Sequence, residues 1–105
     1  MAKISLTDES GVPEGRWFDD EKATKYEESV HWDGSNNISD ATGSQWDHET
    51  LFRTAQGNYV LEHRSQWAGK PTTYQRIDQD TAMKWLASQG HHDAIPKEVL
   101  TNLEI

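Results

Sequence analysis

The chain has 105 residues, 33% of them hydrophobic, and a formal net charge of −8 at pH 7. This length accommodates one domain with a single core, for which five Trp, three Tyr and two Phe supply much of the apolar area. The absence of cysteine excludes disulfides, thiolate metal sites and cysteine nucleophiles. The negative charge disfavours association with nucleic acid or with anionic membranes over the surface as a whole.

The N-terminal segment predicts a short strand in an otherwise irregular arm. It lacks the apolar run of a signal peptide, and no stretch reaches the ~20 apolar residues of a membrane span. We therefore expect a cytoplasmic protein with no membrane association. Ile4 and Leu6 alternate with polar residues and predict an edge strand, whereas the glycines and the proline between 11 and 15 indicate that 1–15 is otherwise a mobile arm.

The next two segments predict a helix and then a polar connection. Asp19 and Asp20 precede an acidic first turn, and Ala23, Tyr26 and Val30 form a narrow apolar stripe. This pattern predicts a helix from about residue 20 to residue 30. Residues 31–45 are polar and rich in turn formers, which predicts either a long ordered loop or a pair of very short strands.

Residues 47–65 predict a β-hairpin with its turn at Gly57. A two-residue turn at 56–57 and a four-residue loop at 55–58 both place Thr54 opposite Tyr59. Because side chains alternate along a strand, one face then forms the core and the other is solvated. The expected core face carries Phe52, Tyr59 and Leu61, and the other face carries Leu51, Val60, Arg53, Glu62 and Arg64.

A three-residue block occurs twice, as Ser44-Gln45-Trp46 and Ser65-Gln66-Trp67, at the open end of this hairpin. In the expected register the two tryptophans lie opposite each other across the strands. Cross-strand aromatic pairs stabilise sheets, so the pair has an interpretation as packing alone. Tryptophan is also a residue that anchors protein interfaces, so the pair has an interpretation as a contact surface as well.

The C-terminal third predicts one more strand and two helices. Residues 72–77 predict a strand, although Tyr74 and Ile77 cannot both face one core in a regular strand. Asp78 predicts the cap of a helix that ends at Gly90, and Pro96 is suited to begin a last short helix. The expected fold class is α+β, with a small antiparallel meander sheet of three to five strands packed by two or three helices.

The stretch from Thr42 to Thr54, with the second Ser-Gln-Trp block and the capped helix that follows, resembles short uncharacterised bacterial and mobile-element proteins. The pattern is TGSQWxHExLxRT followed by SQW, and the resemblance spans roughly residues 17–92. It implies a compact accessory protein of bacterial or mobile-element origin. It assigns no catalytic residue and no ligand.

No cluster in the sequence predicts catalysis or a cofactor. The five histidines lack the spacing of a zinc site, and 33–38 lacks the glycine and the closing glutamate of a calcium loop. Neither Ser44 nor Ser65 lies in a nucleophile elbow, and no glycine-rich phosphate loop is present. We therefore expect a protein that is not an enzyme and that requires no cofactor or metal.

The sequence favours a binding or regulatory module whose partner is another protein. Its acidic balance would suit an inhibitor or antitoxin-like factor that acts on a basic, nucleic-acid-handling protein. The alternative is a nucleic-acid or nucleotide binder that uses an Arg/Trp face of the sheet. Homodimerisation through a hairpin edge is a further option. The residues expected to contact the partner are Trp46, Trp67, Arg53, Arg64 and Tyr74.

Overall fold

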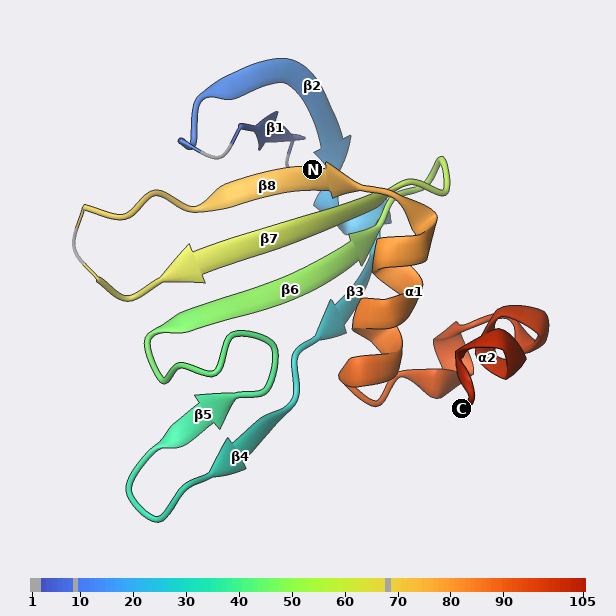
Figure 1. Cartoon of the computed structure of the whole chain (residues 1–105). Coiled ribbons are helices and arrows are strands. Elements are labelled where there is room, and N and C mark those ends of the chain that lie inside the picture. The colour runs from blue at the N-terminus through green and yellow to red at the C-terminus, as the bar shows by residue number, and fades with distance from the viewer. Residues whose placement is uncertain (1–2, 9, 68) are drawn as a thin grey trace.

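The computed structural model describes residues 3–8, 10–67 and 69–105, and these form eight strands, two α-helices and two 3₁₀ turns (Figure 1). The strands are β1 (Lys3–Thr7), β2 (Pro13–Asp19), β3 (Thr24–Glu27), β4 (Val30–Trp32), β5 (Asn37–Ser39), β6 (Asp47–Arg53), β7 (Tyr59–Ser65) and β8 (Thr73–Ile77). The helices are α1 (Gln79–Ser88) and α2 (Lys97–Leu103), and the 3₁₀ turns are η1 (Asp20–Lys22) and η2 (His92–Ala94).

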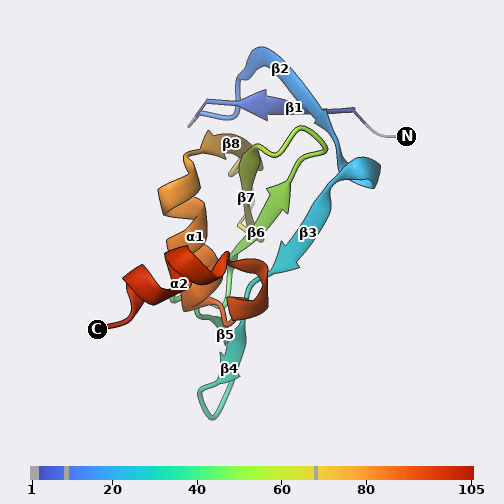
Figure 2. The same cartoon turned by 90° about the vertical axis from the view of Figure 1, so that its right-hand side faces the viewer.

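The centre of the fold is an antiparallel four-stranded sheet in the order β3-β6-β7-β8. Two further hairpins, β1–β2 and β4–β5, form separate two-stranded sheets. Figures 1 and 2 show α1 on one face of the central sheet, while β2 crosses the opposite side on its way to β3. The predicted α+β class with a small antiparallel sheet and helical packing is confirmed.

Two hydrophobic clusters lie on opposite faces of the central sheet. On the face that α1 covers, Leu51, Met83 and Leu86 are completely or almost completely buried. On the other face, Phe52 and Val60 pack against residues of the β1–β2 hairpin. Both faces of the sheet are therefore covered near the β6–β7 turn, which explains why apolar residues are consecutive there, at 51–52 in β6 and at 59–61 in β7.

The predicted helix over 20–30 is wrong. Asp19 does cap a turn, because its side chain accepts a hydrogen bond from the Glu21 backbone at 3.0 Å, but that turn is η1 and ends at Lys22. The chain then extends as β3 and pairs with the free edge of β6, with Tyr26 opposite Leu51. Ladder hydrogen bonds to an open sheet edge outweigh a narrow helical stripe that rests on local propensity alone.

The predicted register of the hairpin is wrong by one residue. Tyr59 pairs with Arg53 and not with Thr54, and Leu61 pairs with Leu51 and not with Phe52. The cause is a five-residue loop, closed by a hydrogen bond of 2.8 Å from the Thr54 backbone N–H to the Asn58 carbonyl. Leu51 therefore faces α1 with Tyr59 and Leu61, while Phe52 moves to the opposite face with Val60.

The two-sided core also resolves the parity of the third predicted strand, which is β8. Tyr74 packs in the cluster with Phe18, and Ile77 packs in the cluster with α1. The predicted cap of α1 is confirmed, since the Asp78 side chain accepts a hydrogen bond of 2.8 Å from the Thr81 backbone. The helix predicted to begin at Pro96 is confirmed as α2.

The segments that flank the core also follow the predictions in part. Residues 31–45 contain the short β4–β5 pair, one of the two predicted alternatives, and this hairpin projects from the body of the molecule (Figure 1). The predicted N-terminal strand is β1, but residues 13–15 of the expected arm belong to β2, which pairs with β1. Residues 1, 2 and 9 of that arm lie outside the described residues. Among the helices of the described part of the chain, none is long and apolar enough to cross a membrane.

Candidate functional site: a paired tryptophan surface

The repeated Ser-Gln-Trp block corresponds to a repeated local structure. In the first copy the Ser44 hydroxyl accepts a hydrogen bond of 2.9 Å from the backbone N–H of Trp46. In the second copy the Ser65 hydroxyl accepts a hydrogen bond of 3.1 Å from the backbone N–H of Trp67. In each copy the serine lies two residues before the tryptophan, and its hydroxyl closes the same kind of side-chain turn. The sequence repeat therefore encodes two equivalent turns that end in an indole.

The two turns bring the tryptophan rings into contact. The ring centroids of Trp46 and Trp67 are 5.2 Å apart and the rings are tilted by 49°. The backbone N–H of Gln66 donates a hydrogen bond of 2.9 Å to the Trp46 carbonyl, which extends the β6–β7 pairing by one residue. The predicted contact between the tryptophans is confirmed, although Trp46 lies level with Gln66 because the register differs by one residue.

The tryptophan pair remains accessible to solvent. Trp46 keeps 40% of its surface exposed and Trp67 keeps 54%. Aromatic pairs in a core lose nearly all of their exposure, so this pair is only half packed. We call Trp46, Trp67 and the turns that carry them the tryptophan surface.

The loop between β5 and β6 is held by its own hydroxyl groups. The Ser39 hydroxyl accepts hydrogen bonds from the backbone of Ala41 and Thr42, at 3.2 and 3.3 Å. The Thr42 hydroxyl donates a hydrogen bond of 2.7 Å to the Asp47 carbonyl and accepts one of 3.2 Å from the Ser44 backbone. Hydroxyl groups thus satisfy backbone groups that no sheet partner reaches, and the loop is fixed up to Trp46.

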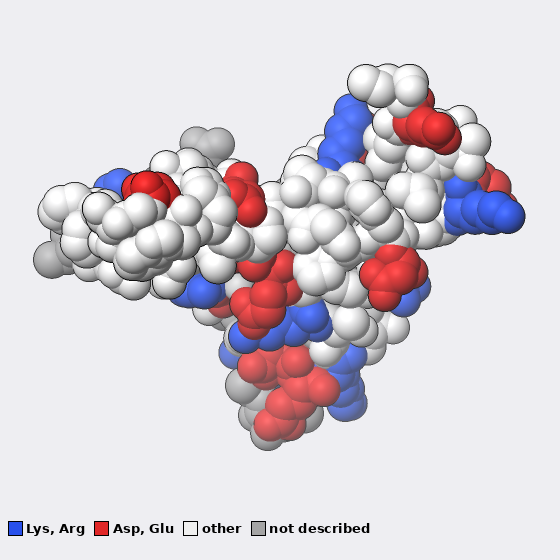
Figure 3. Space-filling view, turned by 90° about the horizontal axis from the view of Figure 1, so that it is seen from below, with Lys and Arg blue, Asp and Glu red and all other residues white. Residues whose placement is uncertain are grey.

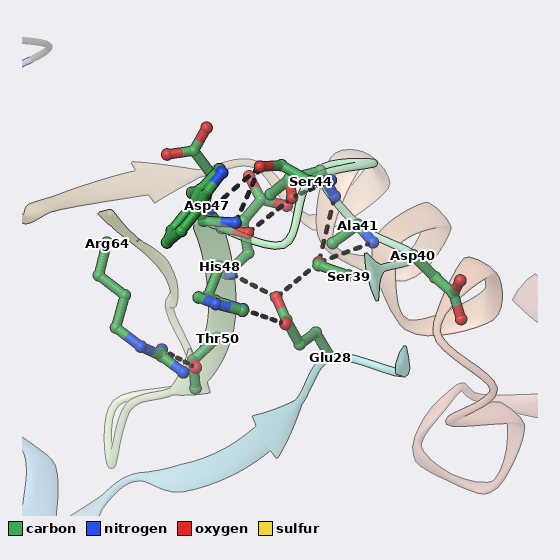
Figure 4. Close-up of polar contacts among 12 residues, drawn as sticks. Glu28, Ser39, Asp40, Ala41, Ser44, Asp47, His48, Thr50 and Arg64 are labelled. Atoms are coloured by element: carbon green, nitrogen blue, oxygen red, sulfur yellow. Dashed lines mark hydrogen bonds and ion pairs between the residues drawn. The ribbon is translucent and has the colours of Figure 1, made fainter. Parts of the chain in front are cut away.

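A buried carboxylate anchors this loop to the central sheet. The side chain of Glu28 is only 6% exposed and lies between β5 and β6 (Figure 4). Its Oε1 accepts hydrogen bonds from the Ser39 hydroxyl at 2.8 Å and from the Glu49 backbone at 2.6 Å. Its Oε2 lies 2.8 Å from Nδ1 of His48. A buried carboxylate requires such partners, and here they join three separate segments of the chain.

Two acidic residues on β6 have shifted pKa values. A hydrogen bond from the Ser65 side chain and the charge of Lys70 lower the pKa of Asp47. Burial raises the pKa of Glu49, against the opposing effect of the hydrogen bond of 3.1 Å from Nε1 of Trp85. Both shifts follow from structural contacts of the two carboxyl groups.

The other residues expected at a contact surface are dispersed. Arg53 and Arg64 lie on opposite faces of the sheet, because their positions along the β6–β7 ladder differ by an odd number of steps. Nη1 of Arg64 donates to the Thr50 hydroxyl at 2.8 Å (Figure 4). It also donates to Glu62 at 2.7 Å, so this arginine is part of the framework. Of the five expected residues, the two tryptophans are in ring contact, Arg64 and Tyr74 both lie beside Glu62, and Arg53 lies on the opposite face.

Tyr74, the fifth of these residues, has a packing role. Its ring lies 6.3 Å from that of Phe18, in the cluster under β1–β2. Burial, followed by the nearby Glu62 carboxylate, raises the pKa of Tyr74 to about 12. The phenol therefore stays protonated at neutral pH.

Four of the five histidines make individual hydrogen bonds in the described part of the chain. His31 lies 2.6 Å from Asp40, and His91 lies 2.6 Å from the Glu27 carbonyl. Across the described ranges of the chain, no group of three or more potential ligands has metal-binding geometry.

Reasoning from the sequence missed Glu28, Ser39 and Thr42, which position the tryptophan surface. The predicted helix over 20–30 includes Glu28 and gives no reason for its carboxylate to meet β5 and β6. The available signal was the pair of serines, each two residues before a tryptophan, because this spacing is typical of a hydroxyl-capped turn. Comparison with protein-family models, curated proteins and solved structures finds no match.

Proposed function

We propose that the chain is a non-catalytic protein-binding module, and that the tryptophan surface is its contact with a basic partner protein. The observation that carries this proposal is the exposure of Trp46 and Trp67 at 40% and 54% while their rings remain in contact. Tryptophan is enriched among the residues that dominate binding energy in protein interfaces.

The mounting of the two tryptophans supports a recognition role. Their turns are closed by Ser44 and Ser65, and the loop that leads to Trp46 is tied to the buried Glu28. Aromatic residues that are already ordered lose little conformational entropy on binding, so more of the contact energy appears as affinity. A purely structural pair would gain nothing from remaining half exposed.

The charge distribution supports a basic protein as the partner. The lobe at the left of Figure 3, on the side of the β4–β5 hairpin and the open end of β6–β7, is mostly uncharged, while acidic and basic residues alternate over the centre. The core of a protein interface is commonly depleted of charged residues, as this lobe is. The net charge of −8 favours encounter with a positively charged protein, and indole rings accept arginine or lysine side chains.

The same features weigh against the alternative of a nucleic-acid or nucleotide binder. That function needs a continuous cationic strip beside aromatic rings. Arg64 is paired with Glu62, and Arg76 donates a hydrogen bond of 3.0 Å to Asn58. Arg53 lies on the opposite face, so the cations expected to form one platform are divided between two faces.

The proposal is tested by photo-crosslinking in the native host, with a photoreactive amino acid at Gln66 beside the tryptophans. We expect a covalent adduct with one basic protein, and binding of that purified protein is expected to weaken by at least about tenfold in Trp67→Ala. Ser65→Ala is expected to weaken binding less, because it loosens the turn and keeps the ring.

The matched control is Trp17→Ala, which removes a tryptophan that is 55% exposed on β2 of the separate β1–β2 hairpin. It should leave the affinity within about twofold, as surface residues outside an interface do. Equal losses in Trp17→Ala and Trp67→Ala would contradict the proposal. Crosslinks between two copies of this chain, or retention of nucleic acid that salt releases, would replace it with a homodimer or with the nucleic-acid alternative.

A further inference from the structure

A second candidate site lies at the opposite end of the central sheet from the tryptophan surface. A cavity of about 320 Å³ opens between the sheet face that α1 covers and the segment that follows α1. Arg53 and Tyr59 line it from β6 and β7, and Tyr26 lines it from β3. Gln79 at the start of α1 and Asp93 of η2 complete the polar part of its wall.

The donor groups around this cavity are without partners. The Arg53 guanidinium, the hydroxyls of Tyr26 and Tyr59 and the Gln79 amide make no hydrogen bond or ion pair with any residue in the described part of the chain. By contrast, Lys25 and Lys84 each lie 3.1 Å from a carboxylate, and Arg64 lies 2.7 Å from one. The side chains of Arg53 and Gln79 are exposed to solvent, so an arginine without a protein partner beside three further donors is open to an acceptor that comes from outside the chain.

The walls of the cavity are fixed before any ligand arrives. Arg53 and Tyr59 are direct partners in the β6–β7 ladder, so their spacing is set by the sheet. The Tyr26 ring lies 5.5 Å from the ring of His91, which in turn stacks on Trp85 at 6.3 Å. Nε2 of His91 lies 2.6 Å from the Glu27 carbonyl, which fastens the segment after α1 to β3. A preformed site of this kind requires little reorganisation on binding.

We propose that this cavity binds a small zwitterion of the α-amino-acid class, with its carboxylate on Arg53 and its ammonium group on Asp93. A guanidinium pairs with a planar carboxylate through two parallel hydrogen bonds. Asp93 is the single carboxylate on the wall, and it both attracts an ammonium group and repels a ligand with two negative charges. The volume is at the lower end of the ~300–1,000 Å³ typical of ligand pockets, which suits a small molecule.

The test is a titration of the full-length protein, followed by two-dimensional amide NMR, with glycine, acetate and inorganic phosphate as separate probes. We expect glycine to shift the side-chain resonances of Arg53 and Gln79 in a saturable manner, with an affinity about tenfold above that of acetate. Arg53→Lys is expected to weaken glycine binding by about tenfold, since lysine lacks the planar fork. Asp93→Asn should remove the preference for glycine over acetate.

Two controls make the result specific to this cavity. Arg76→Lys makes the same change on the opposite face of the sheet, and Trp67→Ala alters the tryptophan surface. Both variants should bind glycine as the wild type does, and the dispersion of the amide spectrum shows that each is folded. Shifts that do not saturate, or a glycine affinity that is unchanged in Arg53→Lys, would overturn the proposal. Tighter binding of phosphate than of glycine would assign the cavity to phosphate esters in its place.

Discussion

At the scale of single residues, the polar side chains near the tryptophan surface act mainly as a framework. Glu28 is the centre of this framework, because one buried carboxylate receives hydrogen bonds from β5 and β6 and lies beside His48. A buried charge with a full set of partners gives a region one defined geometry, and loss of any partner leaves an uncompensated charge. Removal of the Glu28 charge therefore tests whether this carboxylate stabilises the fold.

We expect Glu28→Gln to lower the free energy of unfolding by about 1–3 kcal/mol, because the amide has one acceptor oxygen where the carboxylate has two and its hydrogen bonds are no longer charge-assisted. Urea denaturation followed by circular dichroism measures this change. Glu27→Gln is the neighbouring control, since its side chain is 60% exposed and pairs with an exposed lysine. It should change stability by no more than about 0.5 kcal/mol, and equal effects of the two substitutions would contradict the buried role of Glu28.

The raised pKa of Glu49 predicts a specific dependence of stability on pH. The folded state binds a proton at Glu49 more readily than the unfolded state, in which the carboxyl group has its ordinary pKa of 4.5. Stability due to this group therefore falls as the pH rises through the interval between 4.5 and the raised pKa. We expect Glu49→Gln to be more stable than the wild type at neutral pH, and this difference should vanish below the lower limit of the interval.

The measurement for Glu49 is the urea midpoint of both proteins at neutral pH and at a pH below 4.5. The groups that face Glu49 include Trp85, which donates a hydrogen bond to it, and the nearby His63 and Glu28. A difference between the two proteins that does not change with pH would show that ionisation of Glu49 has no part in stability.

At the scale of elements, the central sheet requires both of its covers. The β1–β2 hairpin supplies Leu6 and Phe18, each 5% exposed, to the face that carries Phe52 and Val60. In β2 the preceding residue, Trp17, points to the other side, where it is 55% exposed and lies under Nζ of Lys3. Two adjacent aromatic residues thus have different roles because strand geometry alternates.

We expect Phe18→Ala to destabilise the protein by about 3–5 kcal/mol, through lost apolar contacts and the cavity left behind. Trp17→Ala should cost no more than about 1 kcal/mol, which is the scale of a cation–π contact at an exposed site. Thermal and urea unfolding of the two variants side by side measures the difference. Similar losses from both substitutions would show that the β1–β2 hairpin does not cover the sheet through Phe18.

At the scale of the whole molecule, the described residues form a flattened body with extents of 40 × 38 × 23 Å and a radius of gyration of 14.4 Å. The two hydrophobic clusters lie on opposite faces of one thin sheet. Leu51 and Phe52 are consecutive in β6, yet they belong to different clusters. Unfolding of either cluster disturbs β6, so the two clusters are expected to unfold together.

This coupling predicts a single cooperative unfolding transition. Far-ultraviolet circular dichroism, which reports the sheet and helices, should give the same urea midpoint as near-ultraviolet dichroism of the tryptophans. The coincidence should persist in Phe18→Ala and in Leu86→Ala, which weaken opposite faces. Separate transitions, or a native α1 in a protein whose β1–β2 hairpin has unfolded, would show that the two clusters are independent.

The sequence alone determined those features that depend on neighbouring residues. The cap at Asp78, the strand at 73–77, the turn near Gly57 and the contact of the two tryptophans all follow from local chemistry or from strand pairing over a short loop. These interactions span few residues, so the pattern of polar and apolar side chains is sufficient to specify them.

Only the tertiary structure decided the remaining features. The segment 20–30 has the sequence signals of a helix, but residues 24–27 pair with the free edge of β6 and form β3. A five-residue loop in place of a four-residue loop changed the face of every side chain on one strand relative to the other, which separated Arg53 from Arg64. The anchoring of the tryptophan surface by Glu28 and the gathering of Arg53, Tyr26 and Asp93 both join distant segments. The pattern of polar and apolar residues along the chain does not predict such contacts, because they stabilise the protein only after the sheet has brought the segments together.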